Sequence, residues 1–427
     1  MSHNPNLTHH SRPAPMSTDP RFDLVVYGAT SFVGQILSRY LHERFPPGGA
    51  LRWAIAGRSK SKLEALRDEL GATPESLPLL LAEAHDDAAL AQLCAQTRVV
   101  ASTVGPYALY GESLVRQCAE AGTDYCDLTG EPQWIRRMLQ AHEGAAQASG
   151  ARIVHCCGFD SIPSDLGVLY LQDQARQRFG ETCVGIQMRV KAMRGAASGG
   201  TVASLLQAVK EASANKALRR ELANPYSLCS EDKHPKTRQR NIHGAQFDQG
   251  FDAWVAPFVM APINTRIVQR THALLGRPWG GESFRYDEAS LMGKGLKGRL
   301  SASAFSAGLT AFMLGAALPP TRWALQRFVL PAPGEGPSPE AQARGFYDLR
   351  FLGQTASGQT IRCKVTGDRD PGYGSTAKIL GEAAAMLALE TPKGEPVGGF
   401  WTPATALGLP LIARLRERSG LSFEVLD

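Results

Sequence analysis

Residues 22–34 read FDLVVYGATSFVG, and they give the strongest indication of the fold. Its first six residues form a short apolar run, which is typical of a buried parallel strand. Gly28 ends the run, and the pattern after Gly34 indicates a helix over 35–45. A strand, a glycine turn and a helix in this order predict the phosphate-binding start of a Rossmann unit.

The same rhythm continues to about residue 156, with apolar runs alternating with helical patterns. Strands and helices that alternate at this spacing predict a doubly wound parallel sheet, and therefore an α/β fold. We expect this Rossmann domain to span 21–165. The expected strands are 51–56, 77–81, 98–102, 125–128 and 152–156, and the expected helices are 60–70, 87–96, 111–121 and 132–149.

After about residue 180 the rhythm changes, which predicts a second, α+β domain over 166–375 for substrate binding or dimerisation. Residues 183–192 alternate apolar and polar side chains, as in a strand with one face toward water. The remainder, 376–427, is expected to pack back on the Rossmann domain. Further expected elements are strands near 258–268, 346–352 and 360–366, a helix over 201–222 with Thr201 as its N-cap, and a helix over 376–389.

The composition describes an ordinary folded chain of 427 residues, 43% hydrophobic and 20% charged. The net charge of +6 comes without a block of Lys and Arg, so nucleic acid is not an expected partner. The eight cysteines form no CxxC pair and are not clustered with histidines at metal-ligand spacing, so no metal site is expected. No GxSxG, HExxH or Walker lysine motif supports a hydrolase or an NTPase.

The first twenty residues are polar and proline-rich, and they lack the apolar region of a signal peptide. We expect a disordered tail over 1–20, with Met16 as an alternative start. Together with the scattered cysteines, this favours reduced thiols and a cytoplasmic protein.

The glycine turn is the first candidate site, and it contains Gly28, Ala29, Thr30, Ser31, Phe32, Val33 and Gly34. Binding of a pyrophosphate needs a tight turn, a close backbone approach and free N–H groups at a helix start. Ser31 stands at the position of the central glycine, where its Cβ restricts the approach although its N–H can still donate. The alternative interpretation is a tight turn with a purely structural role.

The end of the second strand sets the choice of cofactor. NAD-specific domains usually place an acidic residue there, to accept hydrogen bonds from the ribose 2′-hydroxyl. This chain has Arg58 and Ser59 instead, with Lys60 and Lys62 close behind. Because arginine pairs well with phosphate, NADP(H) is favoured over NAD(H). A solvated helix start would explain the lysines but not the missing acid.

The loop after the fourth strand, Thr103, Val104, Gly105 and Pro106, is expected to border the nicotinamide, because ligands bind at the carboxyl ends of such strands. Tyr107 is the candidate catalytic residue. It either donates a proton or only shapes the pocket, and Tyr110 is a weaker candidate.

Two further loops carry polar residues. In GFDSIPSDLG at 158–167, Asp160 or Ser161 either caps the helix that Pro163 begins or supplies contacts near the substrate. In SGGT at 198–201, the helix start either attracts an anion or is only a cap.

No charged residue lies between Arg299 and Arg322, so the segment 300–321 is strongly apolar. A buried or tunnel-lining helix is the favoured interpretation. The alternatives are an amphipathic contact with a membrane and a true membrane span. The flanking Lys294, Lys297, Arg299 and Arg322 would suit an anionic lipid surface.

Taken together, the motifs resemble the saccharopine dehydrogenase-like oxidoreductases, and most closely their trans-acting enoyl reductase branch. Ser31 departs from the glycine usual in that family. The matching segments are GATSFVG at 28–34, AGRS at 56–59, TVGPY at 103–107, YCDLTGE at 125–131, GFDSIPSDLG at 158–167, SGGT at 198–201, FRYDE at 284–288, PAPGEGPS at 331–338, DPGYGSTAKILGEAA at 370–384 and FWTPATALG at 400–408.

This resemblance implies an NADPH-dependent reductase that acts on the carbon–carbon double bond of polyketide or fatty acyl chains. The acyl or enoyl substrate would be carrier-bound and delivered by a synthase partner. Some relatives associate with membranes. This suits a cytoplasmic protein that is held peripherally at the inner face of the plasma membrane through 300–321. A homodimer is also expected. Two alternatives stay open: an amino-acid or polyamine dehydrogenase, and a non-catalytic NADP(H)-binding protein associated with membranes.

Overall fold

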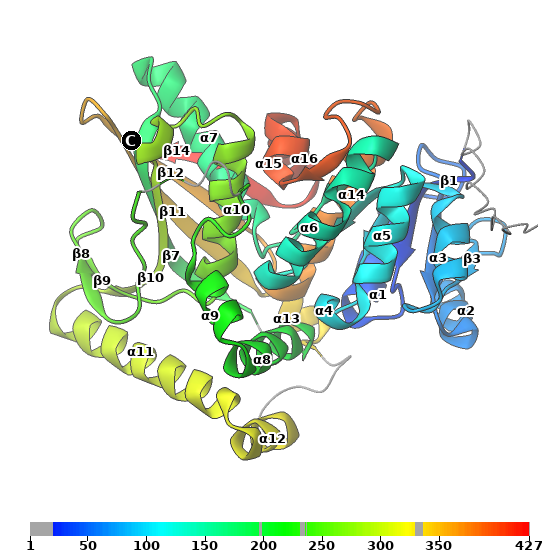
Figure 1. Cartoon of the computed structure of the whole chain (residues 1–427), viewed down its shortest axis with the longest axis horizontal. Coiled ribbons are helices and arrows are strands. Elements are labelled where there is room, and N and C mark those ends of the chain that lie inside the picture. Colours follow the sequence, from blue (N-terminus) through cyan, green and yellow to red (C-terminus); the bar gives the residue numbers. More distant parts are fainter. Residues whose placement is uncertain (1–19, 196–198, 231–234, 236, 329–335, 427) are drawn as a thin grey trace, which may run out of the picture.

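Two seven-stranded sheets form the centre of the molecule in a computed structural model (Figure 1). The structure describes residues 20–195, 199–230, 235, 237–328 and 336–426. Residues 1–19 of the tail predicted over 1–20, Ser198 of the SGGT motif and residues 331–335 lie outside the described residues.

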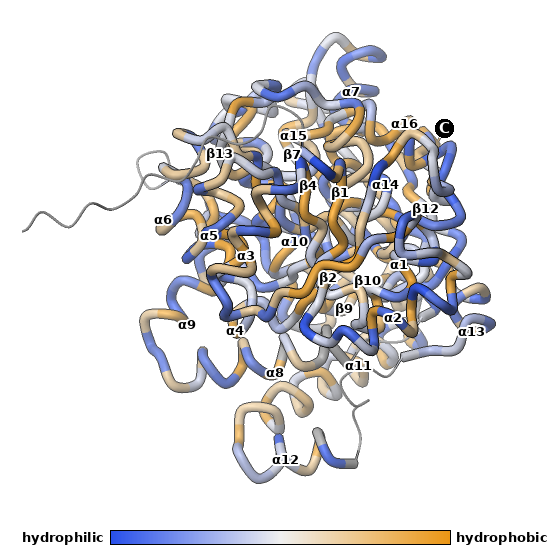
Figure 2. Tube along the Cα trace, turned by 90° about the vertical axis from the view of Figure 1, so that its right-hand side faces the viewer, coloured by the Kyte–Doolittle hydropathy of each residue, from blue (hydrophilic) through white to orange (hydrophobic). Residues whose placement is uncertain are grey.

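The first sheet, sheet A, has the order β13-β6-β5-β4-β1-β2-β3, and all its strand pairs are parallel. This arrangement confirms the predicted doubly wound sheet. Its central strands are the strongly hydrophobic segments in the interior of the molecule (Figure 2). The strands are β1 Phe22–Tyr27, β2 Trp53–Gly57, β3 Leu79–Leu81, β4 Thr97–Ser102, β5 Asp124–Asp127, β6 Arg152–Val154 and β13 Gly399–Trp401.

Helices cover both faces of sheet A. The helix α14, Thr376–Leu389, is buried along almost its whole length and packs on β1, β4 and β5 and on the helix α1. A short helix, α4, follows the TVGPY turn where the sequence pattern indicated none. The other helices of this half are α1 Phe32–Arg44, α2 Lys60–Glu69, α3 Asp87–Cys94, α4 Tyr107–Tyr110, α5 Glu112–Ala121 and α6 Pro132–Ser149.

The second sheet, sheet B, has the order β14-β12-β11-β7-β10-β9-β8. Only the pair of β7 and β10 is parallel, which confirms the α+β character predicted for this half. The strands predicted at 183–192, 346–352 and 360–366 are confirmed. The strands are β7 Cys183–Arg194, β8 Gln246–Asp248, β9 Ala253–Ala256, β10 Arg285–Gly293, β11 Phe346–Thr355, β12 Thr360–Gly367 and β14 Leu421–Leu426.

The helices of this half include α7, which packs on β7, β11, β12 and β14 of sheet B. They are α7 Ile162–Phe179, α8 Gly199–Ala214, α9 Lys216–Ala223, α10 Ala261–Leu274, α11 Gly295–Ala317, α12 Pro319–Phe328, α13 Pro339–Ala343, α15 Pro403–Ala406 and α16 Gly408–Arg418.

Two expected elements were wrong. The strand near 258–268 is the start of α10, because Pro262 suits a first helical turn and the buried Ile263 and Ile267 are one turn apart. The helix over 201–222 is two helices, since the Asn215 side chain accepts hydrogen bonds from two backbone N–H groups and starts α9. Also, α8 begins at Gly199 and not after a cap at Thr201.

The C-terminal segment, 376–427, contributes one strand to each sheet. β13 pairs with β6 of sheet A, whereas β14 pairs with β12 of sheet B. The expectation that all of 376–427 packs on the Rossmann domain is therefore wrong for its last strand. The boundaries at 165 and 375 stay predictions.

The helix α11 contains most of the apolar segment 300–321, and it runs along the outer edge of the molecule (Figure 1). Leu296, Leu300 and Leu314 are 70%, 61% and 64% exposed, and only 17% of the most apolar stretch is buried. The favoured expectation of a buried or tunnel-lining helix was wrong. One face, with Ala302 and Ala316, packs against the protein, and the leucines point elsewhere.

A buried ion network connects three strands of sheet B. Arg189 on β7 is fully buried, and its Nη2 atom lies 2.6 Å from a carboxylate oxygen of Asp248 and 2.6 Å from one of Asp287. Burial raises the pKa of Asp287 although Arg189 opposes this. The guanidinium of Arg189 contacts both carboxylates, and the charge of Arg240 also lowers the pKa of Asp287.

Candidate active site

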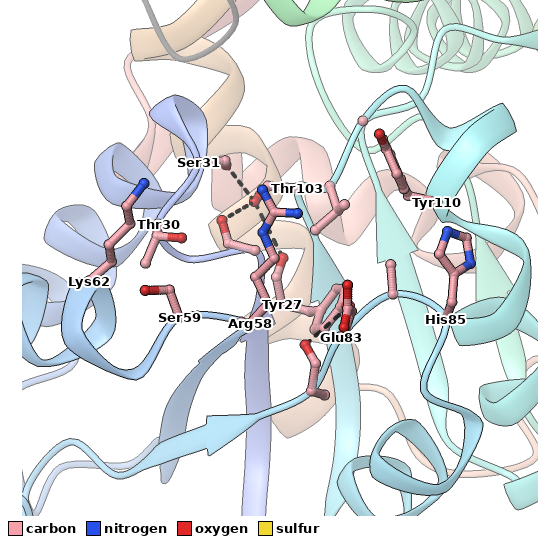
Figure 3. A pocket seen from close by; sticks show the side chains of 16 residues that line it. Tyr27, Thr30, Ser31, Arg58, Ser59, Lys62, Glu83, His85, Thr103 and Tyr110 are labelled. Carbon is pink, nitrogen blue, oxygen red and sulfur yellow. Dashed lines mark hydrogen bonds between the residues drawn. The ribbon is translucent and has the colours of Figure 1, made fainter.

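A pocket with a cavity volume of about 320 Å³ opens at the carboxyl ends of the strands of sheet A (Figure 3). Four loops line it, and they follow β1, β2, β3 and β4. In doubly wound sheets this edge is where nucleotides bind. The lining residues are Tyr27, Gly28, Thr30, Ser31, Gly57, Arg58, Ser59, Lys62, Ala82, Glu83, Ala84, His85, Thr103, Val104, Gly105 and Tyr110.

Two glycines make the close approach in the first loop possible. Gly28 has a φ of +82°, and a Cβ atom there would lie 2.4 Å from Val104 Cγ2. A Cβ atom on Gly34 would lie 2.2 Å from the carbonyl oxygen of Gly28. Both residues must therefore be glycine, the first for its conformation and the second for the contact between helix and turn.

Ser31 has a definite role in place of the expected glycine. It is the N-cap of α1, and its hydroxyl accepts a hydrogen bond of 3.0 Å from the N–H of Gly34. The same hydroxyl lies 2.9 Å from Thr103 Oγ1, which also lies 2.9 Å from the carbonyl oxygen of Gly28. Ser31 thus joins the helix start to the loop after β4. Its φ of −69° requires no glycine.

Several residues predicted to bind cofactor do not line the pocket. Ala29 lies in the core, and the Phe32 ring packs against Tyr373 with 4.6 Å between ring centroids. These residues pack against the protein on the side of the glycine turn that faces away from the pocket. The predicted residues outside the pocket are Ala29, Phe32, Val33, Gly34 and Pro106, and those that line it are Gly28, Thr30, Ser31, Arg58, Ser59, Thr103, Val104 and Gly105.

Arg58 and Lys62 supply positive charge beside the end of β2, and both are exposed. Within the part of the chain that the structure describes, Arg58 has no ion-pair partner. Its guanidinium is thus free to pair with a 2′-phosphate, as the missing acid in the sequence suggested.

Sequence reasoning missed the residues that the loop after β3 brings to the pocket. Glu83 and His85 line it there, and Tyr27 lies at its base. Burial, followed by the charge of Glu83, raises the pKa of Tyr27 to about 12. The signal was available, because a third strand was expected near 77–81 and the carboxyl ends of parallel strands share one edge.

Tyr107, the candidate catalytic residue, is turned into the protein. It is buried, its hydroxyl donates a 2.9 Å hydrogen bond to the carbonyl oxygen of Ser102, and it accepts one from the N–H of Leu128. Burial and the charge of Asp127 raise the pKa of Tyr107 well above its usual value. The geometry corrects the proposal of a proton donor. Tyr107 does not line the pocket, so the alternative that it shapes the pocket wall is not supported either; it holds the turn after β4 in place, and Tyr110 lines the pocket together with Tyr27.

The chain is similar to known proteins over its first domain and over nearly its whole length. The model of the saccharopine dehydrogenase NADP-binding domain matches residues 24–154. A Mycobacterium tuberculosis relative, whose name gives trans-acting enoyl reductase as provisional, is 39% identical over 96% of this chain and 99% of its own. The trans-acting enoyl reductase of Mycobacterium ulcerans is 37% identical over 94% of this chain and 97% of its own.

The chain belongs to the trans-acting enoyl reductases. It is an NADP-dependent oxidoreductase, and the family expected from the motifs is confirmed. The saccharopine dehydrogenase (L-Glu forming) of Saccharomyces cerevisiae has the same fold, with a TM-score of 0.52 and 14% identity over 95% of this chain and 99% of that one.

The site of this reductase fits NADP(H). A side chain at position 28 would fill the cradle, the start of α1 faces the turn, and Arg58 with Lys62 matches a 2′-phosphate. Among the residues that the structure describes, no group of His, Cys, Asp and Glu is arranged to hold a metal ion.

The GFDSIPSDLG loop of the reductase does not cap α7 through a side chain. Ser161 occupies the N-cap position, but its hydroxyl donates to Asn264 Oδ1 at 3.1 Å. Asn264 in turn donates to Glu288 Oε2 at 3.0 Å, and burial raises the pKa of Glu288 to about 7. The expected N-cap position of Ser161 is confirmed, but its side chain does not cap the helix, because Asn264 of α10 accepts the hydrogen bond of its hydroxyl.

The start of α8 also closes on this edge of sheet A. Ser204 donates a 2.7 Å hydrogen bond to Glu131 Oε1, and that oxygen also accepts from the N–H of Tyr107. The segment that follows the SGGT motif therefore lies over the TVGPY turn, where a substrate would reach the nicotinamide.

Proposed function

We propose that this reductase saturates the carbon–carbon double bond of an enoyl thioester, which a synthase partner presents on its carrier, with NADPH as reductant. The observation that carries the proposal is a sequence identity of 37–39%, over more than nine-tenths of the chain, to proteins named for this activity. The pocket supports it, because the turn at Gly28 and the cations beside β2 suit the cofactor.

When bound, NADPH supplies the hydride. The residues of the chain hold the cofactor in position. The N–H groups at the start of α1 would hold the pyrophosphate, Arg58 would pair with the 2′-phosphate, and the loop at 103–105 would border the nicotinamide half. Fixing the two reactants in this way contributes to the rate before any side chain takes part in the chemistry.

The test is NADPH consumption by the full chain with enoyl thioesters of several lengths, both free and carrier-bound, with the product identified by mass. We expect saturated acyl thioesters. Oxidation of saccharopine-like substrates with NADP⁺ would favour the amino-acid dehydrogenase instead. Cofactor binding without turnover of any substrate would favour the non-catalytic alternative.

We also propose a peripheral contact with the inner face of the plasma membrane through α11. Among the described helices, α11 alone has the length and hydropathy to cross a membrane, and most of its apolar side chains are exposed. Lys297, Arg299 and Arg322 stand near its two ends and suit anionic headgroups. Such a surface would bring the reductase to lipid-like substrates.

We expect the triple variant Leu296→Ser, Leu300→Ser and Leu314→Ser to bind anionic vesicles at least about tenfold more weakly, because each buried leucine contributes roughly 1.5–3 kcal/mol. Co-sedimentation with phosphatidylglycerol vesicles measures this. The control replaces Val259, Val397 and Leu409, which are exposed elsewhere. Equal binding by both variants would contradict the proposal, and resistance to alkaline carbonate would indicate a true span. The homodimer stays a prediction.

A further inference from the structure

Asp160 lies at the edge of sheet A where the substrate end of the cofactor belongs. It follows β6, and the loop after β5 faces it, since a Cβ atom on Gly130 would lie 3.9 Å from Asp160 Cγ. The N–H of Leu128, in that same loop, binds the hydroxyl of Tyr107 behind the turn after β4. The loops after β4, β5 and β6 are therefore neighbours, and Asp160 lies beyond Gly105 along the expected course of the cofactor.

The carboxyl of Asp160 differs from every other acid of this region in being unbound. Within the described residues it has no hydrogen-bond or ion-pair partner, and it is partly exposed. Asp127 instead accepts from His155 Nδ1 at 2.7 Å and from two backbone N–H groups. Glu131 accepts from the N–H groups of Tyr107 and Ala108 and from Ser204.

Glu288 is the other acid with a raised pKa near this region, but its two oxygens are bound. It accepts from the hydroxyl of Tyr286 at 2.7 Å and from Asn264 at 3.0 Å, and it is buried. A carboxyl held in this way serves packing, whereas the unbound one can exchange a proton with a substrate.

The surroundings of Asp160 favour its neutral form at neutral pH. Burial, and then the charge of Asp127, raises the pKa of Asp160 to about 7. The titratable groups that face it are Asp127 with its partner His155, Tyr107 and Cys156. None of them is a lysine or arginine that would stabilise the carboxylate.

We propose that Asp160 is the acid that protonates the substrate carbon next to the thioester carbonyl. This inference rests on the proposed enoyl reduction. A hydride adds to the carbon β to the carbonyl, and the electron pair of the double bond moves onto the α carbon and the carbonyl. The O–H bond of Asp160 breaks as the α carbon takes its proton, and water reprotonates the carboxylate. Enoyl thioester, NADPH and one proton thus give acyl thioester and NADP⁺.

The first test is Asp160→Asn, which keeps the shape and removes the acid. We expect kcat to fall about 100-fold or more, the usual contribution of a general acid, with NADPH affinity within about twofold. Wild-type kcat should be constant below pH 7 and fall above it, because the neutral form disappears, and this limb should vanish in the variant. Asp160→Glu should restore part of kcat. Asp173→Asn, on the distant part of α7, should change nothing.

A second readout is independent of turnover. The infrared difference between wild type and Asp160→Asn, without cofactor, should show a protonated carboxyl that titrates near pH 7. A carboxylate already ionised at pH 5, or full kcat in Asp160→Asn, would overturn the proposal. A wild type that does not reduce enoyl thioesters would overturn both the proposed function and this step. A protonated carboxyl band in that inactive protein would separate the two failures: Asp160 would still be an unbound acid near neutral pH, but not one that protonates an enoyl thioester.

Discussion

We expect Arg58→Ala to weaken NADPH binding about 10- to 100-fold and to leave NADH binding within about twofold of wild type. Only NADPH has the 2′-phosphate, and a hydrogen bond to a charged group contributes roughly 1.5–3 kcal/mol, which corresponds to this range. Lys62 remains in the pocket and keeps the loss from being larger. The discrimination between cofactors should therefore depend mainly on one exposed guanidinium.

Fluorescence titration of the cofactor-free reductase with NADPH and NADH measures both affinities. The matched control is Lys60→Ala, because Lys60 is a cation only two residues after Arg58 but pairs with Glu64 at 3.7 Å and does not line the pocket. Equal losses for NADPH and NADH in Arg58→Ala would remove Arg58 from the 2′-phosphate and would point to a general effect on the loop.

The second large effect is expected in the core of sheet B. Arg189→Met should lower the free energy of unfolding by about 3–5 kcal/mol, because it removes the buried cation that contacts both Asp248 and Asp287. Because the methionine side chain is similar in length to that of arginine, the loss of stability comes from the lost charge and not from lost volume.

Urea unfolding followed by circular dichroism measures this effect. Lys191→Met, two residues along the same strand, is the control, because Lys191 is exposed and lies 3.7 Å from Asp348. An exposed ion pair contributes about 0–1 kcal/mol, so the control should differ little from wild type. A loss below about 1 kcal/mol in Arg189→Met would mean that water reaches the two carboxylates.

The Rossmann half could be predicted because its signals are local. The strands β1 and β2 are short apolar runs, and the turn that follows each has glycine or polar residues directly after the run. The C-terminal half was harder, since β14 joins sheet B after β13 has joined sheet A, and no local pattern indicates which sheet a strand will join. Local patterns can also mislead within one segment. The run at 258–268 resembled a strand, but from Ala261 onward, with Pro262 in the first turn, it forms the helix α10.

The candidate site divides in the same way. The turn at Gly28 and the cation at Arg58 were predicted, because one strand and the start of the next helix contain all that they need. Glu83 and the unbound carboxyl of Asp160 emerged only from the structure, because their surroundings come from separate loops that meet at the sheet edge.

Residues close together in the chain were enough to predict the Rossmann fold, the NADP(H) turn and the family. Three other features became visible in the packed fold alone: Ser31 caps α1 and contacts Thr103, Tyr107 faces inward, and α11 is exposed. The physical reason is that a side chain's partner, its burial and its proton affinity depend on elements distant in sequence, which only the packed fold brings within contact distance.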